Sequence, residues 1–270
     1  MRTYIMTGKT SDFTTFYSPS IRLDSTKRYE AALLSIDMYN SIPNITDENN
    51  EFRYTTDKGK NWKTIKLDIG SYELSAINEE IQFQMKKSGD YNVADGSYYI
   101  DISANISKLK SVINITNADY AIDFVPNQNS VGSVLGWNGG VLSGIGQYDS
   151  PNIVDIIKIN SLLVNIDIIM GSFVNGVSSP TIYSFYPNVP PGFKLIQTPM
   201  PSLIYYPVSR TEIDSMRCWI TDQNGKPVDL RGEAITIRLA IKEVPSMKNE
   251  IINAVKQMLK DRIIKDIKDI

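Results

Sequence analysis

Alternation of apolar and polar residues recurs along most of the chain, which is the pattern typical of β-strands. It is clearest in residues 29–38, 50–54, 62–67, 98–102, 111–115, 120–124, 162–168, 181–185, 194–197, 203–206, 215–221 and 234–241. Turn-forming residues separate these segments, among them Asp57–Lys60 and Asp222–Gly225. Because successive side chains of a strand point to opposite faces, the alternation predicts short strands that each bury one face.

Helical spacing is rare before residue 245. Ile77, Ile81 and Met85 recur at helical intervals after Ser75, a suitable N-cap, and residues 131–137 favour one short helical turn. The regular alternation of strands with long amphipathic helices that parallel α/β folds need is missing. The sequence therefore predicts an all-β fold, a β-sandwich.

The two ends of the chain differ from the middle. Residues 1–25 are polar and turn-rich, with isolated aromatic side chains, and are predicted to form an N-terminal arm. From Pro245 the apolar residues fall at spacings of three and four between charged ones, which predicts a C-terminal amphipathic helix over residues 245–270. Residues 26–244 are then the sandwich. The helix either folds back on its own domain or docks on a neighbour; its mixed acidic and basic face makes a membrane surface the weaker alternative.

Composition removes several classes of function. Of the 270 residues, 42% are apolar and 21% are charged, as in an ordinary globular protein. A formal net charge of −2 and a pI near 5.4 argue against a protein that coats nucleic acid. No secretory signal pattern and no apolar run long enough to span a bilayer are seen, so no membrane span is expected.

The chain contains no histidine and one cysteine, Cys218. Histidine is the usual general base near neutral pH and a common metal ligand, so a Ser–His–Asp triad, a Cys–His dyad and any histidine-containing metal site are excluded. Without histidine to activate it, Cys218 is expected to pack inertly, and with no partner it makes no intramolecular disulfide.

The remaining patterns that suggest chemistry are weak. Carboxylate pairs such as Asp101 with Asp123, or Asp155 with Asp167, could act as acid–base pairs. The favoured interpretation is that these residues lie on the solvent-exposed faces of strands. Asp222–Gly225 lacks the spacing of a calcium loop, and the glycines of residues 132–146 lack a phosphate-loop context and are expected to mark a mobile loop. No catalytic residue, cofactor or metal ion is predicted, and the protein is not expected to be an enzyme.

Aromatic residues and prolines alternate between residues 183 and 207. The aromatic members are Tyr183, Phe185, Tyr186, Phe193, Tyr205 and Tyr206. Tyrosine is favoured at protein interfaces, and proline stiffens extended segments. These six residues are predicted to form an interface, together with Ile252, Val255, Leu259 and Ile263 of the C-terminal helix. A rigid connection over one end of the sandwich is a compatible alternative.

The order of several segments resembles a known family. They are ALLSIDMYNSIPNI (32–45), NNEFRY (49–54), WKTI (62–65), IGSYELSAIN (69–78) and WITDQNGKPVDLRGEAITIRL (219–239). Together they resemble the minor capsid, or penton, proteins of small eukaryotic DNA viruses and their integrated relatives, the polintons, adintoviruses and virophages. The resemblance covers residues 30–243.

This resemblance implies a single jelly roll of two four-stranded antiparallel sheets. It also implies a homopentamer at each vertex of an icosahedral double-stranded DNA virion, held among hexamers of a double-jelly-roll major capsid protein and assembled inside the host cell. No sequence-specific binding of nucleic acid is expected. The alternative function is a β-sandwich module that binds a ligand or receptor, with an aromatic residue such as Trp137 in contact with the ligand. A carboxylate-based glycosidase ranks third.

Overall fold

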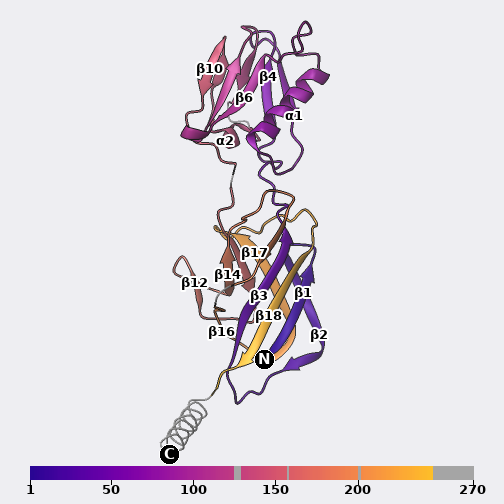
Figure 1. The fold of residues 1–270 in the computed structure, drawn as a ribbon, viewed down its shortest axis with the longest axis vertical. Helices are drawn as coiled ribbons and strands as arrows, with labels where there is room; N and C mark the ends of the chain where they lie inside the picture. Colours follow the sequence, from indigo (N-terminus) through magenta and orange to yellow (C-terminus); the bar gives the residue numbers. More distant parts are fainter. Residues whose placement is uncertain (125–128, 157, 200–201, 246–270) are drawn as a thin grey trace, which may run out of the picture. The chain divides into compact units, whose positions relative to one another are not determined.

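The computed structural model describes residues 1–124, 129–156, 158–199 and 202–245, and it divides into two compact units (Figure 1). Unit 1 consists of residues 1–39, 161–189 and the described chain from Lys194 onward. Unit 2 consists of residues 40–160 with the short segment 190–193. Along the sequence, unit 2 is thus an insertion between two strands of unit 1.

Unit 1 contains two antiparallel sheets. The β3 sheet has the order β1 (Arg2–Gly8), β18 (Ile235–Glu243), β3 (Tyr29–Tyr39) and β15 (Lys194–Gln197), with the two-residue β16 (Tyr206–Pro207) also paired to β3. The β17 sheet has the order β14 (Thr181–Phe185), β11 (Leu162–Ile166), β17 (Glu212–Asp222) and β2 (Asp12–Arg22). A separate hairpin of β12 (Ser172–Val174) and β13 (Val177–Ser179) lies between β11 and β14 along the chain.

The connectivity of unit 1 is that of a jelly roll. When its eight longer strands are numbered in chain order, the β3 sheet contains the first, eighth, third and sixth. The β17 sheet contains the fifth, fourth, seventh and second. Consecutive strands therefore alternate between the two sheets except where β14 follows β11, as two Greek keys require. The all-β prediction and the jelly roll of two four-stranded antiparallel sheets are confirmed.

The two sheets of unit 1 enclose an apolar core. Alternate residues of the long strands are buried, as the period of two predicts. The core includes Met6, Ile36, Met38, Met216, Cys218, Ile220, Ile237 and Leu239. Cys218 lies opposite Phe13 of β2 and Ile166 of β11, so the only thiol of the chain occupies the interior, as expected.

Residues 1–25 do not form an arm. Their two strands are edge strands: β1 pairs with β18 from Arg2–Ile241 to Gly8–Ile235, and β2 pairs with β17 from Arg22–Glu212 to Asp12–Trp219. Each of these strands has only one buried position, so the alternation of apolar and polar residues within it is weak. The partners lie more than 180 residues away along the chain, and only this long-range pairing makes the segment a strand pair.

Unit 2 has two sheets and one long helix. One sheet has the order β5 (Trp62–Lys66), β4 (Glu51–Thr55), β8 (Ala121–Asp123) and β9 (Val141–Ser143). The other has the order β10 (Gly146–Asp149), β7 (Lys110–Ile115) and β6 (Ile100–Asn105), with η1 (Ile106–Lys108) between β6 and β7. Helix α1 (Leu74–Lys87) contacts β6, and α2 (Gly132–Leu135) is the predicted short helical turn.

A separate apolar core holds unit 2 together. Ile77, Ile81 and Met85 of α1 are fully buried in it, as their spacing predicted, although the N-cap is Glu73 and not Ser75. Residues 26–244 were expected to be one jelly-roll domain, and the structure instead has the jelly roll interrupted by this second unit. Strand alternation looks alike in both units, so the sequence did not reveal the boundary.

Two further expectations differ from the structure. The glycines of residues 132–146 lie within and between α2, β9 and β10, and do not form one loop. Trp137 is buried: its ring stacks on Phe124 at 5.5 Å between centroids, and its Nε1 donates to Ser111 Oγ. The predicted C-terminal helix lies outside the described residues. No helix of the described chain is long and apolar enough to cross a membrane.

A buried carboxylate ties α1 to the sheet of β4 and β5. Asp90, just after α1, accepts a hydrogen bond of 2.6 Å from the Tyr54 hydroxyl and bonds of 2.7 Å from Lys63 Nζ. Burial, followed by the bond to Asp90, raises the pKa of Tyr54 above its ordinary value, so the hydroxyl remains a donor. Since a buried polar group is costly unless it is hydrogen-bonded, this trio fixes how the helix end meets the sheet.

Replacement of Asp90 by Ala is expected to destabilise unit 2 by about 1–3 kcal/mol, because Tyr54 loses its acceptor in the interior. Urea unfolding measured by tryptophan fluorescence in a Trp219→Phe background reports on unit 2, since Trp62 and Trp137 both belong to it. The matched control is Asp149→Ala, which removes the exposed pair with Lys108 and should lower the free energy of unfolding much less than Asp90→Ala does. Equal losses for the two variants would contradict this account of Asp90.

The thiol of Cys218 is expected to be unreactive in the folded protein. It is fully buried, and burial raises its pKa, so both access and the thiolate form are suppressed. Ellman's reagent should therefore react at least about a hundredfold more slowly with native protein than with protein in guanidinium chloride. Because the chain has one cysteine, the signal has a single source, and a similar rate in both conditions would show that the core of unit 1 is open.

Candidate interaction surfaces

The outer face of the β17 sheet carries an ordered group of charged and aromatic side chains. Arg217 of β17 donates through Nε (2.8 Å) and Nη2 to the carboxylate of Asp12 on β2. The same guanidinium lies 5.0 Å from the centroid of the Trp219 ring. The hydrogen bond from Arg217 lowers the pKa of Asp12, so both partners stay charged, and the pair holds the tryptophan from one side.

A second ion pair occupies the same unit. Arg210 Nη2 lies 2.6 Å from Asp167 Oδ2 and also donates to the carbonyl oxygen of Ser215. Asp167 Oδ1 accepts from the backbone N–H of Arg217 at 3.0 Å. The charges of this region therefore compensate one another.

The carboxylate pairs that the sequence singled out are not brought together as acid–base pairs. Asp101 of β6 accepts from Asn78 and Gln82, whereas Asp123, on the other sheet of unit 2, pairs with Arg53 at 2.9 Å. Asp155 belongs to unit 2 and Asp167 to unit 1. In the described ranges, no group of three or more Asp, Glu, Cys or His side chains is arranged to hold a metal ion.

An open groove of about 570 Å³ lies on unit 1 beside Trp219. Residues of β11 and β17 form its floor. The β12–β13 hairpin supplies one wall, and the turn after β17 supplies another.

The β12–β13 hairpin was missed in the sequence. Its turn is Asn175-Gly176, with φ of 50° and 81°, the left-handed backbone that a type I′ turn requires and that Asn-Gly favours. Val174 and Val177 flank this dipeptide, so the hairpin signal was present although short. Phe173 is 69% exposed on it, which gives the hairpin an apolar surface.

Both flanks of the jelly roll expose apolar side chains. One flank is formed by the edge strands β1 and β2, which touch through the edge-to-face rings of Tyr4 and Tyr17. It exposes Ile5 and Phe16, the latter to 81%. The opposite edges are β14 and β15, where Ile196 is exposed and Tyr186, which follows β14, is 67% exposed.

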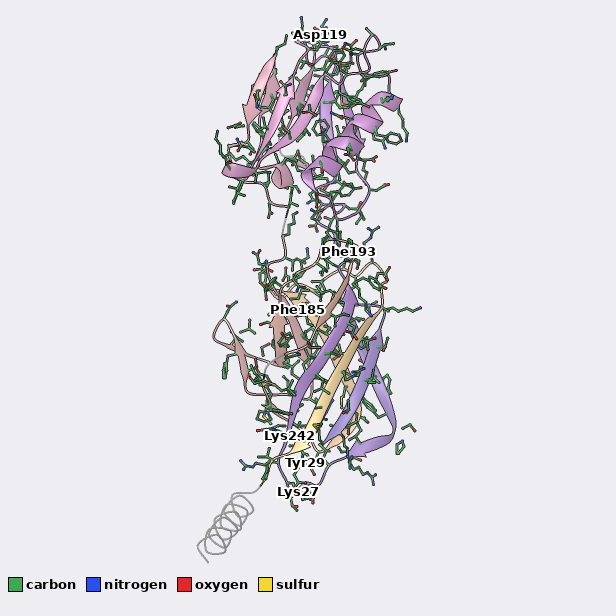
Figure 2. All side chains as sticks on the ribbon, in the orientation of Figure 1. Lys27, Tyr29, Asp119, Phe185, Phe193 and Lys242 are labelled. Carbon is green, nitrogen blue, oxygen red and sulfur yellow. The ribbon has the colours of Figure 1, made fainter. Side chains whose placement is uncertain are left out.

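The six aromatic residues predicted as an interface do not form one surface. Tyr186 and Phe193 are exposed. Tyr183 and Phe185 instead lie opposite Val164 and Leu162 with stacked rings, and Phe185 is buried; Figure 2 marks its position on β14.

The last two aromatic residues of the set lie along the β3 sheet. Tyr205 lies beneath Lys242 Nζ, 3.3 Å from its ring centroid, and Tyr206 pairs with Ala31. Ile252, Val255, Leu259 and Ile263 lie outside the described residues. The interface itself remains a prediction, and Tyr186 is its best-placed member in unit 1.

The chain is similar to solved structures but not to characterised sequences. No protein-family model and no curated protein sequence matches the chain. Among solved structures, the chain is similar to the crystal structure of the selenomethionine-labelled mavirus penton protein, with 11% sequence identity and a TM-score of 0.47. The match covers 90% of this chain and 99% of the other.

Proposed function

We propose that the protein is a structural capsid protein that forms the pentameric vertices, or pentons, of an icosahedral double-stranded DNA virus or a virus-like integrated element. The observation that carries this proposal is the jelly roll with exposed apolar side chains on two opposite flanks. The sequence segments that resemble penton proteins support it independently. No catalytic step is part of the proposal.

A ring of identical subunits needs two different complementary patches on each subunit. In such a heterologous contact, one flank of a subunit touches the opposite flank of the next. Phe16 and Ile5 on one flank, with Tyr186 and Ile196 on the other, supply apolar surface for both sides of one contact. The same contact would shield the edges of β1, β2, β14 and β15, whose backbone groups are otherwise open to unwanted pairing.

The proposed partners are further copies of this chain and hexamers of a major capsid protein, and the proposed location is the virion. Residues 2–8 and 12–22 are strands β1 and β2 of the two sheets, so the proposal gives the N-terminal segment no role in tying the vertex to other components. The segment from Ser246 to Ile270 remains for this role, and we propose that its apolar residues dock on a neighbouring capsid subunit.

The ligand-binding alternative also has a specific observation in its favour, the groove beside Trp219. It is compatible with a vertex protein, because the groove uses the face of one sheet and the ring contact uses the edges of both.

Replacement of Phe16 by Ser is expected to weaken the ring. Burying a phenylalanine side chain contributes roughly 1.5–3 kcal/mol, so each contact should weaken about 10- to 100-fold. Tyr186→Ser should act in the same direction from the opposite flank. Sedimentation velocity over a concentration series measures the shift from pentamer to monomer.

The matched control for these variants is Phe83→Ser. Phe83 is also an exposed aromatic residue, but it lies on α1 of unit 2 and not on a flank of the jelly roll. It should leave the association unchanged. If Phe16→Ser and Tyr186→Ser both leave the pentamer as strong as in the wild type, the flank contact is wrong.

A chain that ends at Pro245 is expected to form the pentamer but to enter capsids less efficiently when it is co-expressed with its major capsid protein. The reason is that the docking segment is lost while the jelly roll is complete. The amount of penton per purified capsid, measured by quantitative mass spectrometry, should fall at least about threefold. Equal incorporation of the full and shortened chains would refute a docking role for residues 246–270.

A further inference from the structure

We propose that the groove on the β17 sheet is a binding site for a neutral saccharide. The groove has a volume of about 570 Å³, within the range of roughly 300–1,000 Å³ that is common for small-molecule sites. It lies wholly in unit 1, on strands whose register is fixed by pairing on both sides: β11 between β14 and β17, and β17 between β11 and β2. The proposal does not depend on the assembly of a vertex.

The lining of the groove is polar but uncharged. It combines carboxamides, hydroxyls and one indole, represented by Asn165, Asn175, Asn224, Ser178, Thr221 and Trp219, with a few aliphatic residues. No side chain that lines it carries a charge. Arg217, the cation that lies against the Trp219 ring, is paired with Asp12.

This lining selects a class of ligand. A charged ligand would lose its hydration without gaining an opposite charge, which is unfavourable. A wholly apolar ligand would displace water from the exposed side chains of Asn175, Ser178 and Asn224 without replacing the hydrogen bonds of that water. A neutral sugar avoids both penalties. It carries no charge, its hydroxyl groups donate and accept hydrogen bonds, and its C–H faces pack on an aromatic ring.

Trp219 is held in place before any ligand arrives. Arg217 lies against its ring, and Arg217 is itself fixed by the two hydrogen bonds to Asp12. Beside it, Asn165 accepts from Thr181 Oγ1 at 2.6 Å and donates to the Trp219 carbonyl at 3.2 Å. Side chains that are already ordered lose little entropy on binding, so a shallow site can still bind a weak ligand such as a sugar.

Unit 2 contains a natural control for this site. Trp62 is also partly exposed, and Arg53 lies 5.1 Å from its ring centroid, almost the same arrangement as Arg217 on Trp219. Trp62 does not line this groove. A comparison of the two tryptophans therefore separates the groove from the effect of an exposed, arginine-stacked indole.

The test is calorimetric titration of the full chain with cellotriose, mannotriose and N,N′,N″-triacetylchitotriose. 3′-Sialyllactose serves as the charged probe, and tetra-alanine serves as the peptide probe. At least one neutral trisaccharide is expected to bind more tightly than both of the other probes. Trp219→Ala should weaken that binding about tenfold or more, and Trp62→Ala should change it less than twofold.

A second pair of variants keeps the test decisive if Trp219→Ala does not fold. Asn224→Ala and Ser178→Ala remove polar groups from the two walls, and the Asn224 backbone bond to Asp222 that shapes the turn is retained. Each should weaken binding severalfold. The proposal is overturned if no neutral trisaccharide binds up to about 10 mM. Tighter binding of sialyllactose or the peptide, or wild-type affinity in all three groove variants, would also overturn it.

Discussion

The structure of unit 1 depends on the pairing of its first two strands with its last two. β1 pairs with β18 along seven residues, and β2 pairs with β17 along most of its length. These pairings complete both sheets, and they place β1 and β2 together as one flank of the jelly roll. Because the partners come from opposite ends of the described chain, the jelly roll closes only after the intervening residues, unit 2 included, have been made. Such non-local contacts are typical of slowly folding β-proteins.

The same strand pairing also positions the side chains of the two proposed binding surfaces, the flank that would contact the next subunit and the groove beside Trp219. Asp12 reaches Arg217 only because β2 lies beside β17, and Arg217 in turn holds Trp219 at the groove. Phe16, on β2, is exposed on the flank for the same reason. The proposed ring contact and the proposed ligand site are therefore two consequences of one strand pair. One uses the edge of the sheet and the other uses its outer face, so both can operate in the same subunit.

Local patterns predicted much of this fold, and long-range pairing explains what they missed. The hairpin turn at Asp57–Lys60 and the buried stripe of α1 depend on residues a few positions apart, and both agree with the structure. The strand character of residues 1–25 depends on partners at residues 212–241, so alternation within the segment was too faint to show it. The boundary of unit 2 was hidden because strands on both sides of it alternate in the same way.

The candidate surfaces were harder to predict than the fold. The parity of Tyr183 and Phe185 places them on one face of β14, but the sequence does not say whether that face points to solvent or to the core. The structure places them opposite Val164 and Leu162, within the unit. The Asn175-Gly176 hairpin carried a local signal, yet its strands are only three residues long and lack an alternating pattern of their own. The groove joins residues from four segments, so no single stretch of sequence shows it.

We propose that this chain is a structural protein that forms a closed ring of five copies. Native mass spectrometry of the full-length wild-type protein, alone and after co-expression with its major capsid protein, tests it most directly. The expected result is a species of five chains in at least the co-expressed sample, with no abundant species of other ring sizes. A monomer in both samples would contradict it.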